Sequence, residues 1–121
     1  MPTITFSVTG VNTANNTVTM TLNGNPATGD LTVDVGTVIQ WNLTRNVDSI
    51  VITQSTGTGN TNIWSSVPAP FPLPNSKNWQ GTIGNTGNIG ESYNITGTAG
   101  GNTVSHDPRI SVNPKTKEDA V

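Results

Sequence analysis

Apolar and polar residues alternate along several short stretches of the chain, as they do in β-strands that bury one face. In Thr3–Val8, the apolar side chains Ile4, Phe6 and Val8 fall on one face and hydroxyl residues fall on the other. Thr17–Leu22 repeats this alternation. Because successive side chains of a strand point to opposite faces, the pattern predicts two strands that are each half-buried.

Similar short segments recur toward the end of the chain. Further strands are predicted at Leu31–Val35, Thr37–Leu43, Asp48–Thr53, Gln80–Ile83, Ser92–Thr96 and Val104–Val112, the last broken by Pro108. No long stretch carries apolar residues at helical spacing without an interrupting Gly or Pro. About eight short strands separated by turn residues are typical of an all-β sandwich or barrel. We therefore predict an all-β fold, a single Greek-key β-sandwich.

Three local features refine this prediction. Ile50–Ile52 is a continuous apolar run, which predicts a central strand covered on both faces. Asn23–Gly24 has the composition of a type I′ hairpin turn, but the nearby Pro26 cannot donate into a β-ladder. We therefore expect the return strand to begin near Asp30. Trp41 lies within a predicted strand, and we expect it in the core between the two sheets.

The composition narrows the chemistry that the protein can perform. Thr, Asn, Gly and Ser together make up 59 of the 121 residues, and 10% of the residues are charged. The chain has no cysteine, which excludes a disulfide framework, a cysteine zinc site and thiolate chemistry. A formal net charge of −2 with five scattered basic residues argues against a nucleic-acid surface.

The organisation along the chain predicts one domain. We expect residues 1–114 to form the sandwich, with a long Pro- and Asn-rich loop at about 55–79, and residues 115–121 to be a charged, frayed tail. The chain opens with a strand pattern in place of the apolar core of a secretory signal, and no stretch is long enough for a membrane helix. The compartment is not determined by these features, which are compatible with a role at the cell surface or outside the cell.

The segment Ser55–Asn78 breaks the regular spacing of the strands. Prolines occupy every second position in Pro68–Pro74, which favours an extended and stiff polyproline II conformation. A loop of this length in a small domain is often functional. Two interpretations remain open: the loop binds a ligand, or it is a lid in which apolar side chains close one end of the sandwich, namely Trp64, Phe71, Leu73 and Trp79.

The order of several motifs resembles the cupredoxin family. Val33–Trp41 is similar to the stretch of two strands around a Gly turn that precedes the first copper ligand, and Asp48–Ile52 falls where that family has a histidine followed by apolar residues. Glu91–Ile95 resembles the penultimate strand, and Ser105–Val112 resembles the exit of the ligand loop and the closing strand. The resemblance implies a cupredoxin-like Greek key, although an immunoglobulin-like strand order shares the same pattern.

The resemblance does not extend to the copper site. A blue-copper centre needs two imidazoles and a thiolate, usually with a weak axial methionine. The chain lacks cysteine, Asp48 or Ser49 stands in place of the first histidine, and Met1 and Met20 lie far from the candidate ligand loop. His106 alone cannot hold copper firmly. We therefore expect a copper-free protein without a cofactor or metal.

No catalytic motif is apparent in the sequence. Ser105–Asp107 contains the residue types of a catalytic triad, but neighbours in an extended chain point to opposite faces and cannot form the relay. The scattered carboxylates form no known pair spacing. The pair that an enzyme would most readily use is His106 with Asp48. We expect the protein not to be an enzyme.

Three functional hypotheses follow from these features. The first is a non-catalytic, lectin-like module that binds carbohydrate or another neutral ligand through aromatic and amide side chains of the long loop, namely Trp64, Phe71, Trp79, Asn60, Asn62 and Asn78. The second is a structural or self-assembling surface or fibre subunit, because strands without lysine are poorly protected against edge pairing. The third is an enzyme using His106. We expect no nucleic-acid partner, no membrane insertion, and a homo-oligomer under the second hypothesis.

Overall fold

The computed structural model describes residues 2–55, 61–74 and 76–114. Within these residues the chain forms strands and no helix. The strands in chain order are β1 (Thr3–Asn12), β2 (Thr17–Leu22), β3 (Asn25–Ala27), β4 (Leu31–Val33), β5 (Val38–Leu43), β6 (Ser49–Gln54), β7 (Trp64–Pro70), β8 (Trp79–Ile83), β9 (Ile89–Ala99), β10 (Asn102–His106) and β11 (Arg109–Val112). The tail predicted to fray, 115–121, lies outside the described residues.

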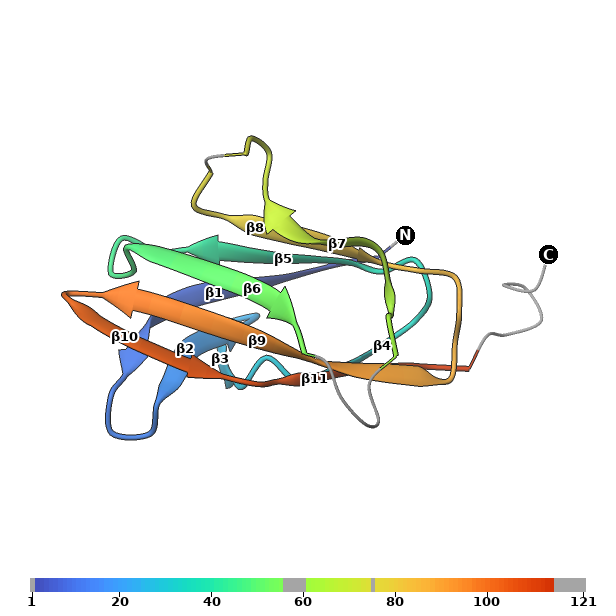
Figure 1. Ribbon diagram of the computed structural model, residues 1–121, viewed down its shortest axis with the longest axis horizontal. Helices are drawn as coiled ribbons and strands as arrows, with labels where there is room; N and C mark the ends of the chain where they lie inside the picture. The colour runs from blue at the N-terminus through green and yellow to red at the C-terminus, as the bar shows by residue number, and fades with distance from the viewer. Residues whose placement is uncertain (1, 56–60, 75, 115–121) are drawn as a thin grey trace.

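The strands form two sheets packed face to face, so the prediction of an all-β sandwich is confirmed. One sheet has the order β3-β2-β1-β5-β8-β7, and we call it the six-stranded sheet. The other has the order β10-β9-β11-β4, with β6 on the opposite side of β9. Each sheet is mixed, because β1 runs parallel to β5 and β4 runs parallel to β11. Figure 1 shows the strands running along the long axis of the molecule.

The core is built around Trp41, as the sequence predicts. Its side chain is fully buried and contacts aromatic rings from both sheets. The ring centroid of Trp41 lies 6.3 Å from that of Phe6, 6.4 Å from that of Trp64 and 5.5 Å from that of Tyr93. Tyr93 belongs to β9, whereas the other three residues belong to the six-stranded sheet. Aromatic contacts of this kind add to the stabilisation that burial alone provides.

Two strand predictions are wrong, and the structure gives the physical reason for each. Ile50–Ile52 does not form a central strand: among the described strands β6 pairs with β9 alone, and Val51 is 49% exposed between two buried isoleucines. The return strand after Asn23–Gly24 begins at Asn25, because both turn residues adopt positive φ as a type I′ turn requires. Pro26 is tolerated there because β3 is an edge strand that needs no outward donor.

The segment 55–79, predicted as one long loop, contains the edge strand β7. Proline-rich sequence is compatible with this strand because its outer edge has no neighbour in the described part of the chain. Trp64 opens the strand and packs against the neighbouring Gly81 of β8, where an added Cβ would lie 2.8 Å from the Trp64 ring. A glycine at this position therefore leaves the space that the indole fills.

Tyr93 links the core to the loop between β3 and β4. Its hydroxyl donates a hydrogen bond of 2.9 Å to the carbonyl of Gly29. Burial raises the pKa of the Tyr93 phenol above its ordinary value, and the Asp30 carboxylate adds to this rise. The indole N–H of Trp41 opposes this rise and lowers the pKa by more than Asp30 raises it, although within the described residues it has no hydrogen-bond partner of good geometry.

We predict that Tyr93 resists ionisation in the folded protein. Because its pKa is raised by folding, the unfolded chain releases the phenolic proton first, and the stability contributed by Tyr93 is lost as the pH rises above about 10. Tyr93 is the single tyrosine of the chain, so phenolate absorbance reports it alone. We expect this absorbance to rise near pH 10 in denaturant and only at higher pH, together with unfolding, in buffer. Coincident titration curves in the two conditions would contradict this prediction.

Candidate functional site

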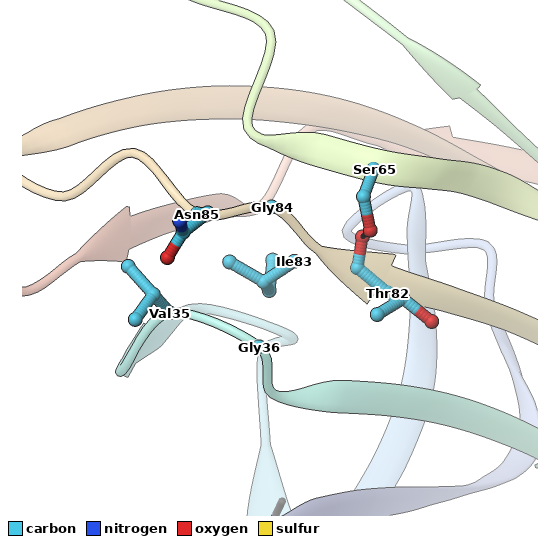
Figure 2. Close-up of a pocket in the computed structure, with 7 residues that line it drawn as sticks. All are labelled: Val35, Gly36, Ser65, Thr82, Ile83, Gly84 and Asn85. Atoms are coloured by element: carbon cyan, nitrogen blue, oxygen red, sulfur yellow. Dashed lines mark hydrogen bonds between the residues drawn. The ribbon is translucent and has the colours of Figure 1, made fainter. Parts of the chain in front are cut away.

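A hollow of about 440 Å³ opens where the β4–β5 turn meets the beginning of β7 and the end of β8. We call it the turn hollow, and its lining residues are Val35, Gly36, Ser65, Thr82, Ile83, Gly84 and Asn85. Figure 2 shows Ile83 between Val35 and Asn85 on one side and Ser65 and Thr82 on the other. Three chain segments that are distant in sequence therefore build one concave surface.

Backbone hydrogen bonds hold the walls of the turn hollow together. The N–H of Gly36 donates to the carbonyl of Gly84 at 3.2 Å, and the N–H of Gly84 donates to the carbonyl of Ile63 at 2.7 Å. The N–H of Ile83 donates to the carbonyl of Thr37 at 2.8 Å. Gly36 has a φ of 80°, a left-handed conformation that favours glycine in this turn. The backbone frame of the hollow is thus fixed before any ligand binds.

The chemistry of the turn hollow is neutral. Val35 supplies apolar surface, and Ile83 lies buried beneath the hollow with 1% of its surface exposed. The hydroxyls of Ser65 and Thr82 and the carboxamide of Asn85 supply polar groups, although the Ser65 hydroxyl already donates a hydrogen bond of 3.4 Å to the Thr82 carbonyl. None of the lining residues is ionisable. The adjacent Asp34 accepts a hydrogen bond of 2.9 Å from the side chain of Asn113. A concave surface with apolar patches and a few uncharged polar groups suits a neutral ligand that presents both C–H faces and hydroxyls.

Trp64, which the sequence predicts as a ligand-binding residue, lies inside the sandwich. Its side chain is 6% exposed, and its indole N–H donates a hydrogen bond of 2.7 Å to the Glu91 carboxylate. The second carboxylate oxygen of Glu91 accepts a hydrogen bond of 3.0 Å from Gln54. The amide oxygen of Asn62 accepts hydrogen bonds from Gln54 and from the backbone N–H of Trp64. This polar network, which we call the Glu91 network, positions the start of β7 directly before Ser65.

The other residues predicted to bind ligand are distributed along the same segment. Trp79 packs partly buried against the core, and the Asn78 side chain accepts a hydrogen bond of 2.9 Å from the N–H of Leu43. Phe71 is 43% exposed in the loop after β7. Asn60 lies outside the described residues. The structure therefore leaves Phe71 as the exposed aromatic of the predicted set and does not assemble the set into one platform.

The pair predicted for an enzyme, His106 with Asp48, has separate partners. The Nδ1 atom of His106 accepts a hydrogen bond of 3.1 Å from the N–H of Val18, so Nε2 carries the proton and donates to the Thr28 carbonyl at 2.9 Å. Asp48 accepts a hydrogen bond from the N–H of Gly100 instead. Gly100 lies just before β10, whereas His106 is the last residue of that strand. The first and last residues of β10 are roughly 13 Å apart by the rise of a strand, so His106 and Asp48 contact opposite ends of β10.

No group of three or more His, Asp or Glu side chains in metal-binding proximity occurs among the residues that the structure describes. Across the same residues there is no helix long and apolar enough to cross a membrane. The sequence analysis missed Val35, Thr82 and Asn85 because single residues from separate turns carry no local signal. Ser65 lies within the predicted loop 55–79, but the sequence predicts ligand binding for the aromatic and amide residues of this segment and not for its serines.

We predict that Trp64 contributes to stability through its hydrogen bond to Glu91. Trp64→Phe keeps most of the buried ring and leaves the buried carboxylate without one donor, which costs about 1–3 kcal/mol of unfolding free energy. The double variant Trp64→Phe with Glu91→Leu should lose less than the sum of the two single variants, because it removes both partners. Urea unfolding measures these free energies. Additive losses would contradict the role of this bond.

Comparisons with known proteins do not identify the chain. No protein-family model matches the sequence, and no curated protein matches it either. The chemistry of the turn hollow therefore rests on the residues that line it.

Proposed function

We propose that the protein is a non-catalytic recognition module that binds a neutral ligand of the carbohydrate class in the turn hollow. The observation that carries this proposal is the combination of the apolar Val35 side chain with uncharged hydroxyl and carboxamide groups in one hollow. Sugars present the matching chemistry, since their C–H faces pack on apolar side chains and their hydroxyls exchange hydrogen bonds with uncharged groups. The pre-formed backbone frame lowers the ordering cost of binding.

The distribution of charge supports a neutral ligand. Among the strands of the described chain, the carboxylates and basic residues are Glu91 and Arg109, and Glu91 is buried in its network. The remaining described charges lie in turns and loops. The outer face of the six-stranded sheet carries uncharged side chains, which include the hydrogen-bonded row Thr5, Gln40 and Gln80 and the exposed Val67. An ionic ligand would find no complementary charge on these surfaces.

The fold is compatible with a copper-free relative of the cupredoxins. The parallel pairing of β1 with β5 and of β4 with β11 supports a Greek-key arrangement in which the chain crosses between sheets. The turn Gly100–Gly101 connects β9 to β10 tightly, so the loop that follows the tyrosine strand offers no room for a ligand set. Recognition through a side hollow fits this arrangement better than electron transfer does.

A second candidate function is a structural or self-assembling subunit. The strands are almost free of charge, and lysine is absent from every described strand. Lysine and net charge are the usual protection of exposed strand edges against pairing. The small net charge of −2 provides little repulsion between copies. This candidate differs from the first because it needs no small ligand.

We predict that binding in the turn hollow is abolished by filling it. Ser65→Phe should reduce binding by at least about tenfold because the new ring occupies the site, and Asn85→Ala should reduce it by roughly 3- to 10-fold through loss of one hydrogen bond. Ser105→Phe, at an exposed position of β10, is the matched control and should bind as the unmodified protein does. A glycan array with and without calcium, followed by titration of the sugars that bind, measures these effects.

Two outcomes would count against the proposal. If the array shows no reproducible binding to a related set of sugars, carbohydrate recognition is rejected and the second candidate gains weight. If sugars bind but Ser65→Phe binds as tightly as the Ser105→Phe control, the ligand lies elsewhere on the molecule, and the exposed Phe71 loop becomes the first alternative.

A further inference from the structure

The edges of the six-stranded sheet are blocked by proline. β3 is three residues long and contains Pro26, which has no N–H to offer. At the opposite edge, the N–H of Phe71 donates inward to the carbonyl of Asn78. Because backbone N–H groups alternate sides along a strand, the nitrogen of Pro70 then lies on the outer side of β7. Neither edge presents a continuous row of donors to an added strand.

The short edge strand β4 of the other sheet is also protected. β4 spans three residues, Leu31–Val33, with an aspartate at the position before it and another after it. β10 lies against β2, where His106 accepts the N–H of Val18 and donates to the Thr28 carbonyl. The N–H of Val18 lies beyond the part of β2 that pairs with β3, and His106 accepts its hydrogen bond.

The outer edge of β6 lacks the proline and the short length that protect the other edges, although Asp48 directly precedes the strand. β6 covers six residues without proline, glycine or charge, and within the described residues it pairs only with β9. The N–H of Ser55 donates to the carbonyl of Ser92 in β9. By alternation, the N–H and C=O groups of Ile50, Ile52 and Gln54 point away from β9. β6 therefore has an open edge with outward N–H donors. In β3, β4 and β7, proline or a short chain length removes such donors.

A few large apolar side chains are exposed in the described chain, and one of them lies on β6. The large hydrophobic residues that are exposed in the described chain are Val51, Val67, Phe71 and Leu73, with exposed fractions of 43–62%. Val51 belongs to β6, Val67 to β7, and the other two to the loop after β7. β6 and β7 are the neighbouring edges of the two sheets and contact each other. Val51 therefore adds an exposed apolar side chain to the open edge strand β6.

We propose that β6 pairs antiparallel with β6 of a second copy of this chain, which joins two five-stranded sheets about a two-fold axis. In the register centred on Val51, Ile50 of each copy exchanges backbone hydrogen bonds with Ile52 of the other. The two Val51 side chains then face each other as a close, non-hydrogen-bonded pair. Asp48 falls opposite Gln54, so no like charges meet.

A second copy fits this edge better than a different protein does. An isologous contact uses the same surface on both partners, and the β6 edge supplies both the apolar residue and the backbone groups that its own copy requires. Because β6 carries no charged side chain, it cannot select a foreign peptide by charge complementarity. Pairing of β6 with β6 would be the first contact of self-assembly, the second candidate function, and it does not depend on sugar binding.

The first test is the mass and amide exchange of the full chain over a range of concentrations. We expect sedimentation equilibrium to show a shift from 12.6 kDa toward about twice that mass. Hydrogen exchange at the amides of Ile50 and Ile52 should slow as the dimer forms, whereas Val51 and Thr53, whose N–H groups face β9, should be protected at every concentration. A monomer at the highest concentration overturns the proposal, as does a dimer whose Ile50 and Ile52 amides exchange equally fast at all concentrations.

The second test is a matched pair of charge substitutions on one sheet face. Val51→Lys places two ammonium groups opposite each other in the proposed register and should weaken dimerisation by at least about tenfold. Ser105→Lys adds the same charge two strands away in the same cross-strand row and should leave dimerisation unchanged. Equal effects of the two variants would overturn the β6 contact. Because sugar binding is measured separately, its failure does not alter either result.

Discussion

The hydrogen bond between the Trp64 indole and the buried Glu91 carboxylate is a specific polar contact within the apolar core that joins the two sheets. Glu91 belongs to β9 and Trp64 to β7, so this bond joins the two sheets across the core. A buried carboxylate is costly unless its oxygens receive donors, and Trp64 and Gln54 supply them. The constraint places the beginning of β7, and therefore Ser65, at the rim of the turn hollow.

Aromatic packing and the Glu91 network act on the same region of the core. Trp41 contacts Trp64 on its own sheet and Tyr93 on the other, and Tyr93 reaches the loop at Gly29. Gly29 has a positive φ, and an added Cβ there would lie 2.6 Å from the Tyr93 hydroxyl. The loop between β3 and β4 is thus held by a side chain of the core.

Strand positions and the Trp41 core could be predicted from alternation because one buried face imposes a period of two. The burial of Trp64 could not, because it follows from a carboxylate 27 residues away that no local pattern reveals. The proline-rich sequence of β7 does not predict a strand, because proline has no backbone N–H. As an edge strand, β7 needs backbone N–H donors on one side only. Ile50–Ile52 was misassigned for the opposite reason: an apolar run predicts burial on both faces, whereas the edge strand β6 exposes Val51.

The scarcity of charge on the strands has consequences for both proposed interactions. Uncharged hydroxyls and amides suit a neutral ligand, and the same lack of charge leaves the β6 edge open to a second copy. The two surfaces use different chemistry, since the hollow is built from side chains of turns and strand ends and the β6 edge from backbone groups. A module that binds sugar at one surface and pairs at another would present two sites to a multivalent ligand.

The most direct test of neutral-ligand recognition is an amide-resolved nuclear magnetic resonance titration with neutral monosaccharides at millimolar concentration. The structure predicts chemical-shift changes confined to the walls of the turn hollow, at Gly36, Ser65 and Thr82–Asn85. A charged sugar acid of the same size should produce weaker changes because no lining residue is ionisable. Saturable shifts at these positions would support the account. Shifts confined to the Phe71 loop, or none with any neutral sugar, would contradict it.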